Sequence, residues 1–398
     1  MGDPNDSLPE EIPGVREALE NNDIAAAAAR IQQYLERENN IPLNIAITGE
    51  TGSGKSTFVN ALRGLSNGDK GAAPTGVTET TVEVTPYPHP NYPNVKLWDL
   101  PGIGTTKFPA KKYLKLVGFE KFDFFIIISD TRFRENDVKL AQEIQKMKKK
   151  YYFVRSKIDN DINAEKKRDF NEEDTLTKIR DNCVHRLRES GFESPQVFLV
   201  SSFELHLYDF SLLHQTLERE LPAHKRHALL RAMPNISLEI IDKKKKTFKC
   251  QLYWLATQSA LGAAVPVPGL SIAVDAAVLV DAVTDYVFAF GLDIPSLKRL
   301  SARTDVSYTA LCAVIISPLA AVEITTELLL KALTQVGHIA TLIAAEEVSR
   351  FIPFIGIPIA MGFSFTTTYN ILNLILDKLA DDAQKLFEMT LNLKIKDE

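Results

Sequence analysis

The most specific chemistry that the sequence suggests is the binding of phosphate groups. Residues 49–56 read G-E-T-G-S-G-K-S, a complete G-x-x-x-x-G-K-S loop directly after an apolar run. Its glycines let backbone N–H groups converge on the α- and β-phosphates, and the N-terminus of the following helix adds its dipole. Lys55 would reach the β- and γ-phosphates, and the Ser56 hydroxyl would bind Mg²⁺. The predicted phosphate-binding residues are Gly49, Glu50, Thr51, Gly52, Ser53, Gly54, Lys55, Ser56 and Thr57.

A second motif, D-x-x-G, begins 44 residues after the loop lysine and ends the next predicted parallel strand. The Asp99 carboxylate can hold a water of the Mg²⁺ shell, and the Gly102 N–H can bond the γ-phosphate. The pattern alone is weak, but its position relative to Lys55 makes it specific. We therefore expect Ser56 and Asp99 at the metal and Gly102 at the γ-phosphate.

A third motif suits the recognition of a guanine base. Ser156, Lys157 and Asp159 follow another predicted strand. A carboxylate accepts hydrogen bonds from guanine N1–H and N2–H₂, whereas adenine presents neither group, and the lysine stem can lie along the base. The usual form of this element begins with Asn or Thr, and an ordinary surface K-x-D turn is the alternative. Ser201 and Ser202, after the last predicted strand, would offer backbone N–H groups to guanine O6.

Residues 74–81 form a Thr-rich polar stretch where a switch segment would lie, with a plain turn as the alternative. Thr81 is the preferred additional Mg²⁺ ligand, with Thr80 or Thr78 as alternatives. Ile103 occupies the place of the water-positioning glutamine of Ras-type GTPases. Glu79, a backbone carbonyl or a group from a second copy must replace that glutamine, and we expect slow turnover by a monomer. The predicted catalytic residues are Lys55, Glu79, Thr81 and Gly102.

The elements that position these motifs alternate between short β-rich runs and helical segments, which indicates a mainly parallel sheet covered on both faces. The run 124–128 is apolar on both sides, so it predicts an inner strand. After residue 208 the sequence reads as helices broken by Pro and Gly, and residues 14–38 also predict a helix. The predicted strands are 43–48, 82–85, 95–98, 122–129, 151–154 and 197–200.

Composition limits the class of protein further. The chain has 398 residues with a net charge of −5, which argues against a general nucleic-acid binder. Its three cysteines are Cys183, Cys250 and Cys312, and their wide spacing and odd number argue against a disulfide framework and a cysteine-based zinc site. The first 13 residues have no signal-peptide pattern, and the myristoylation motif is imperfect because Asp6 stands at its Ser/Thr position. We expect a cytoplasmic protein of two or three domains.

Two long runs, 250–274 and 351–376, carry no charge. Each exceeds the roughly 20 residues that span a bilayer. Prolines and glycines interrupt both, so a buried helical core is the preferred interpretation, and a conditionally exposed membrane-binding face is the alternative. A constitutive transmembrane protein is the least favoured.

Taken together, the motifs closely resemble the immunity-related, interferon-inducible GTPase family over almost the whole chain. The segments that carry the resemblance are GETGSGKS (49–56), FVNALRG (58–64), WDLPGIGTT (98–106), DFFII (123–127), YFVR (152–155) and LPAHKRH (221–227). Lys55 is similar to the lysine of the family's GKS branch, and Glu79 falls at the switch acid that the family looks to use across a dimer.

The resemblance implies a dynamin-like GTPase with an α/β Ras-like P-loop domain and an all-α domain built from both termini. The expected domains are a GTPase domain over 42–214 and a helical domain over 215–398, with segment 1–41 packed on the latter. It also implies GTP and GDP as ligands, Mg²⁺, and self-assembly or pairing with other family GTPases. Peripheral association with endomembranes or pathogen-containing vacuoles is implied too. The alternatives are a non-hydrolysing nucleotide-gated scaffold and, disfavoured by Lys157 and Asp159, a P-loop ATPase.

Overall fold

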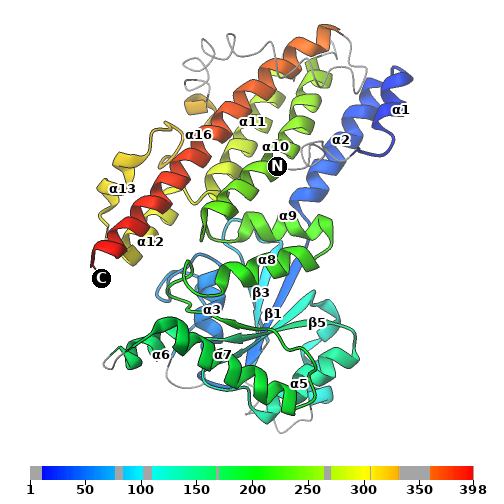
Figure 1. The fold of residues 1–398 in the computed structure, drawn as a ribbon. Coiled ribbons are helices and arrows are strands. Elements are labelled where there is room, and N and C mark those ends of the chain that lie inside the picture. The colour runs from blue at the N-terminus through cyan, green and yellow to red at the C-terminus, as the bar shows by residue number, and fades with distance from the viewer. Residues whose placement is uncertain are drawn as a thin grey trace. The chain divides into compact units, whose positions relative to one another are not determined.

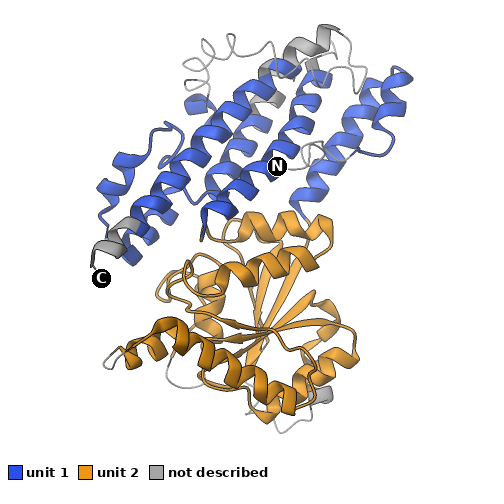
Figure 2. Ribbon diagram, in the orientation of Figure 1, with its two compact units in different colours: residues 1–40, 237–398 blue, residues 41–236 orange. Residues whose placement is uncertain are grey.

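A computed structural model describes residues 11–76, 84–101, 110–166, 170–263, 270–304, 306–329, 331 and 359–397. The chain divides into two compact units (Figure 2). Unit 1 comprises Met1–Asn40 and Ser237–Glu398, and unit 2 comprises Ile41–Ile236.

Unit 2 is built on a six-stranded sheet with the order β2-β3-β1-β4-β5-β6 (Figure 1). Every neighbouring pair is parallel except β2 and β3, which are antiparallel. The predicted fold class is confirmed. The strands are β1 (Leu43–Gly49), β2 (Thr85–Pro88), β3 (Val95–Asp99), β4 (Phe124–Ser129), β5 (Lys150–Arg155) and β6 (Val197–Leu199).

The central strand β4 shows why both faces of the sheet are covered. All six of its residues are buried, as its apolar run predicts. Successive side chains point to opposite faces of a strand. Phe125 and Ile127 lie in a core cluster with residues of α4, α5 and α7, whereas α3 and α8 bring Phe58 and Phe210 together at 5.9 Å between ring centroids. The helices of unit 2 are α3 (Lys55–Leu62), α4 (Ala110–Val117), η1 (Phe119–Lys121), α5 (Glu135–Lys146), α6 (Ile158–Glu165), α7 (Glu172–Glu189), α8 (Phe210–Glu220) and α9 (Ala223–Ala232).

Strand β2 and the end of unit 2 differ from the sequence expectation. The sequence predicts the second strand over 82–85; residues 82 and 83 lie outside the described residues, and β2 starts at Thr85 and contains Pro86 and Pro88. Proline has no N–H to donate to a ladder, which suits the edge position of β2. Unit 2 also runs past the suggested boundary at 214 to Ile236, because α8 and α9 pack on its strands.

Unit 1 is helical and joins the two ends of the chain. Helix α10 packs against both α2 and α16, and their apolar residues share one core cluster that includes Ile31, Trp254 and Phe365. The all-α part formed from both termini is therefore confirmed. The helices of unit 1 are α1 (Val15–Glu20), α2 (Ile24–Asn39), α10 (Leu238–Ala263), α11 (Leu270–Ala289), α12 (Ile294–Thr304), α13 (Tyr308–Val314) and α16 (Ile359–Asp397).

The helix expected over 14–38 is two helices. Asn22 adopts a left-handed conformation with φ 60°, which ends the first helix. The Asp23 carboxylate then accepts a hydrogen bond of 3.0 Å from the Ala26 N–H and caps the second helix.

The described part of the first uncharged run lies in α10 and, from residue 270, in α11. Tyr253, Trp254 and Ala260 are buried in the core cluster of unit 1, which agrees with a core assignment for these residues. Residues 264–269 and 351–358 lie outside the described part of the chain. Among the described residues, no helix combines the length and apolar character that crossing a bilayer demands.

Candidate nucleotide site

The loop between β1 and α3 has a backbone shape that only glycine adopts without strain. Gly49 has φ 145°, and a Cβ at this position would lie 2.0 Å from the backbone oxygen of Ile128 on β4. Gly54 has φ 93° and directly precedes α3. These two glycines let the loop pass close to the sheet and turn into the helix, as the phosphate-binding motif requires.

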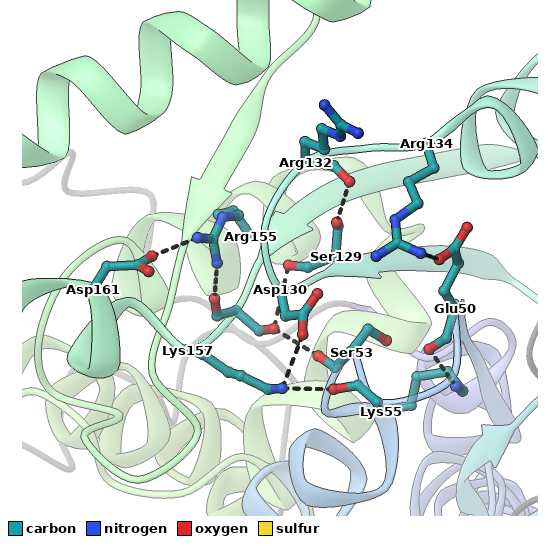
Figure 3. Close-up of polar contacts among 12 residues, drawn as sticks. Glu50, Ser53, Lys55, Ser129, Asp130, Arg132, Arg134, Arg155, Lys157 and Asp161 are labelled. Carbon is teal, nitrogen blue, oxygen red and sulfur yellow. Dashed lines mark hydrogen bonds and ion pairs between the residues drawn. The ribbon is translucent and has the colours of Figure 1, made fainter. Parts of the chain in front are cut away.

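Lys55 is folded back over this loop. It is 7% exposed, and its Nζ donates a 3.0 Å hydrogen bond to the carbonyl oxygen of Glu50 (Figure 3). The Ser53 N–H donates to the same oxygen at 3.2 Å. The amine therefore lies against the loop for which the sequence predicts phosphate binding.

Ser56 and Asp99 meet as the sequence predicts. The Ser56 Oγ donates a 2.6 Å hydrogen bond to Oδ2 of Asp99, which is fully buried at the end of β3. Asp99 lies opposite Ile47 of β1, so the sheet register sets this pair beside the loop. A hydroxyl and a carboxylate are hard oxygen ligands, and this donor set fits Mg²⁺.

The predicted base-recognition residues contact the same loop from the end of β5. The Ser156 Oγ donates to the carbonyl oxygens of Ser53 at 2.6 Å and Ser129 at 3.2 Å. The Nζ of Lys157 donates to the Gly52 carbonyl at 2.6 Å and to Asp130 Oδ2 at 3.0 Å (Figure 3). The structure thus brings Ser156 and Lys157 to the phosphate-binding loop.

Asp159 lies in the first turn of α6 with one carboxylate oxygen, Oδ1, buried. This oxygen has no hydrogen-bond partner among the described residues. A buried acceptor without a donor is costly, so a ligand that supplies N–H groups would relieve it. Guanine N1–H and N2–H₂ are donors of the required kind.

The predicted serines after β6 lie next to this turn. The Ile158 N–H donates to the Val200 carbonyl at 3.3 Å, which joins the Asp159 turn to the segment that contains Ser201 and Ser202. Ser201 is fully buried, and its Oγ accepts from the Phe203 and Glu204 N–H groups at 3.2 Å each. The Ser201 side chain therefore shapes the turn rather than facing a ligand.

Several predicted residues cannot be placed. Thr78, Glu79, Thr80, Thr81, Gly102 and Ile103 lie outside the described residues. Their roles at the metal, the γ-phosphate and the attacking water stay predictions.

The structure adds charged residues that sequence reasoning missed. Arg134 forms an ion pair with Glu50 of the loop. Arg155, directly before the base-recognition motif, pairs with Asp161, two residues after Asp159. No motif marks these pairs, although basic residues just after β4 and at the end of β5 could have been found by asking which cations face the loop acids.

Asp137 is a further charged residue near the loop. It is 1% exposed, and its Oδ2 accepts from the Arg134 N–H at 3.0 Å. Burial raises the pKa of its carboxyl to about 7, and the negative charge of Glu50 adds to the shift. The charges of Arg134 and Lys55 oppose it.

With this geometry established, comparison with known proteins decides the family. The sequence model described as "Interferon-inducible GTPase (IIGP)" matches residues 8–390. The chain belongs to this interferon-inducible GTPase family.

Relatives in the interferon-inducible GTPase family match along nearly the whole chain. The chain is 43% identical over 380 residues to "Interferon-inducible GTPase 5" of Rattus norvegicus, covering 95% of this chain and 82% of the relative. It is 39% identical over 383 residues to "Interferon-gamma-inducible GTPase 10" of Mus musculus, covering 95% and 89%. A solved structure titled "An oligomerised bacterial dynamin pair provides a mechanism for the long range sensing and tethering of membranes" aligns at 15% identity with a TM-score of 0.34. That alignment covers 98% of this chain and 77% of the other.

Proposed function

We propose that this interferon-inducible GTPase binds GTP and GDP at the loop after β1 and hydrolyses GTP with Mg²⁺. One observation carries the proposal. Ser156 and Lys157 are hydrogen-bonded to the loop carbonyls, so Asp159 lies on a turn that is joined to this loop, and its buried Oδ1 has no hydrogen-bond partner within the described part of the chain. A phosphate cradle linked to an acceptor for N–H groups suits a guanine nucleotide.

The residues at the phosphate end have distinct roles in this proposal. Lys55 leaves the Glu50 carbonyl to bind the β- and γ-phosphates, and the loop N–H groups bind the α- and β-phosphates. Ser56 and, through a water, Asp99 hold Mg²⁺, with Thr81 as the proposed switch ligand. Bound Mg²⁺ supplies positive charge that neutralises the phosphate oxygens. Gly102 donates its N–H to the γ-phosphate.

We also propose that self-assembly contributes to catalysis. Because Ile103 stands in place of a glutamine, the chain needs another group to position water, and Glu79 is the proposed one. We expect slow hydrolysis by the monomer and faster hydrolysis when GTP-bound copies, or other family GTPases, associate. This dynamin-like assembly would act peripherally on endomembranes or pathogen-containing vacuoles from the cytoplasm, in cell-autonomous immunity.

The isoleucine at position 103, in place of a glutamine, also favours a second candidate function. A nucleotide-gated scaffold that binds GTP with little or no hydrolysis also requires no water-positioning glutamine. It shares the nucleotide site and differs only in turnover.

Measuring GTP turnover as a function of protein concentration separates these candidates. The GTPase proposal predicts turnover per molecule that rises with concentration, is abolished in Lys55→Ala and is unaffected by excess ATP. A nucleotide-gated scaffold binds GTP without that turnover. Retained turnover in Lys55→Ala overturns the site assignment, and inhibition by ATP favours an ATPase. Turnover per molecule independent of concentration contradicts activation by assembly.

A further inference from the structure

An ion pair outside the recognition motif supports the turn that carries Asp159. Arg155 is the last residue of β5 and is only 4% exposed. Its Nη2 lies 2.5 Å from Oδ2 of Asp161 on α6, and its Nη1 donates to the Ser156 carbonyl (Figure 3). One guanidinium therefore holds residues on both sides of Lys157 and Asp159.

The turn needs this support because its conformation and its charges both work against it. Lys157 has φ 60°, a left-handed conformation that side chains other than glycine disfavour. Burial raises the pKa of Asp161, Arg155 opposes that shift, and the negative charges of Asp159 and Asp130 add to it. Asp159 and Asp130 thus lie close enough to repel Asp161, and the ion pair with Arg155 holds Asp161 beside the turn against that repulsion.

The hydroxyl of Ser156 connects the turn to the loop after β1 and to β4. This hydroxyl has a single hydrogen to donate and is directed at Ser53 and Ser129, toward the phosphate-binding loop and β4. That hydroxyl makes no described hydrogen bond to α6, where Asp159 lies. Arg155 makes the connection to α6 through Asp161.

We propose that the Arg155–Asp161 ion pair positions the Asp159 carboxylate for the guanine 2-amino group and thereby sets the preference for guanine over bases that lack this group. The inference rests on the proposed function, since it requires guanine at Asp159. Arg155 and Asp161 are positioning residues here, because they act on the base through Asp159.

The test compares GDP with inosine diphosphate (IDP), which lacks the 2-amino group, on the full chain. A hydrogen bond to a charged acceptor corresponds to about a 10- to 100-fold preference for GDP in the wild type. Asp161→Asn removes the negative charge of the pair. We expect the ratio of the affinities for GDP and IDP (the GDP/IDP ratio) to fall about 5-fold, the fold-change that corresponds to the loss of a partly exposed ion pair. Affinity for inorganic pyrophosphate, a probe of the phosphate end alone, should not change.

Asp123→Asn is the matched control. Asp123 pairs with Lys225 at 2.5 Å just before β4, in the same unit, and its substitution removes the same charge from another partly buried pair. The GDP/IDP ratio of this variant should equal that of the wild type. Asp161→Glu, which keeps the charge, should recover part of the ratio lost in Asp161→Asn.

Asp159→Asn, measured in parallel, separates the two levels of the proposal. If the GDP/IDP affinity ratio falls strongly in Asp159→Asn but is unchanged in Asp161→Asn, only the positioning role of the Arg155–Asp161 pair is overturned. A ratio unchanged in both variants overturns the guanine site itself. An equal loss of affinity for GDP, IDP and pyrophosphate in Asp161→Asn would assign a general structural role to the pair and also contradict the proposal.

Discussion

The two ends of the proposed nucleotide site are built in different ways. At the phosphate end, the loop after β1 has its shape from backbone conformations at Gly49 and Gly54, and a Cβ at Gly49 would meet the backbone of β4. At the base end, side chains determine the shape: Ser156 and Lys157 bond to loop carbonyls, and Arg155 bonds to Asp161. The shape of the phosphate end therefore depends on the steric limits of the backbone, and the shape of the base end depends on hydrogen bonds and ion pairs of side chains.

This difference explains how each end tolerates sequence change. A backbone cradle admits no substitution where glycine is required, so its motif is complete in this chain. A turn held by side chains can exchange one support for another. Here Ser156 replaces the usual Asn or Thr, and an Arg–Asp pair contributes beside it. Substitutions at the two ends of the site should therefore have different consequences.

The largest effect is expected for Gly49→Ala at the phosphate end. The new Cβ would lie 2.0 Å from the Ile128 oxygen at φ 145°. Backbone strain and overpacking together should lower the free energy of unfolding of unit 2 by about 4 kcal/mol and abolish nucleotide binding. Urea unfolding followed by Trp98 fluorescence in a Trp254→Phe background measures unit 2, since the chain has two tryptophans and Trp254 belongs to unit 1.

Gly68→Ala is the control for that measurement. A Cβ at Gly68 would meet no atom within 4 Å. Its urea midpoint and its GDP affinity should match those of the wild type. A wild-type midpoint for Gly49→Ala would contradict the steric account of the loop.

A smaller, pH-dependent effect is expected for Asp137→Asn, beside the phosphate end. The folded-state pKa of about 7 is above the ordinary value of 3.8, so the folded protein holds this proton longer than the unfolded chain. Wild-type stability from this group is therefore lost as pH rises from about 4 through 7. Asparagine does not titrate and keeps an acceptor for the Arg134 N–H. We expect Asp137→Asn to be more stable than the wild type by about 2 kcal/mol at pH 8 and by much less at pH 4.5.

Asp174→Asn controls for loss of a negative charge, because Asp174 is exposed in the first turn of α7. Urea midpoints at the two pH values are compared for the three proteins. A stability difference between Asp137→Asn and the wild type that does not grow with pH would show that Asp137 is not a buried carboxyl with a raised pKa.

The smallest effect concerns the metal. Ser56→Ala removes the hydroxyl that donates to Asp99 at 2.6 Å. If Ser56 is a Mg²⁺ ligand, GTP affinity in Mg²⁺ should fall about 10-fold, while affinity in excess chelator should hardly change. Equal losses with and without Mg²⁺ would instead assign Ser56 to direct contact with the nucleotide.

Sequence reasoning predicted the loop after β1 and placed Ser56 with Asp99, because a glycine-rich loop after an apolar strand has few other structural solutions. The sheet followed from the same logic, since the apolar run of β4 must be buried on both faces. The edge strand β2 was misplaced because its prolines hide a strand signal. Arg134 was missed because its partner Glu50 lies 84 residues away along the chain, and Asp137 because its burial depends on tertiary packing. Arg155 and Asp161 are only six residues apart, but no motif marks that spacing.

The placement of guanine at Asp159 is tested by the base specificity of Asp159→Asn. An aspartate accepts hydrogen bonds from the guanine N1–H and 2-amino group, whereas an asparagine amide can donate to the 2-oxo group of xanthine. Affinities of the wild type and of Asp159→Asn are measured for GDP and for xanthosine diphosphate by competition with a fluorescent nucleotide. We predict that the wild type prefers GDP and that the variant prefers xanthosine diphosphate, a reversal of about 10-fold or more. An unchanged preference for GDP in the variant would contradict the placement of guanine at Asp159.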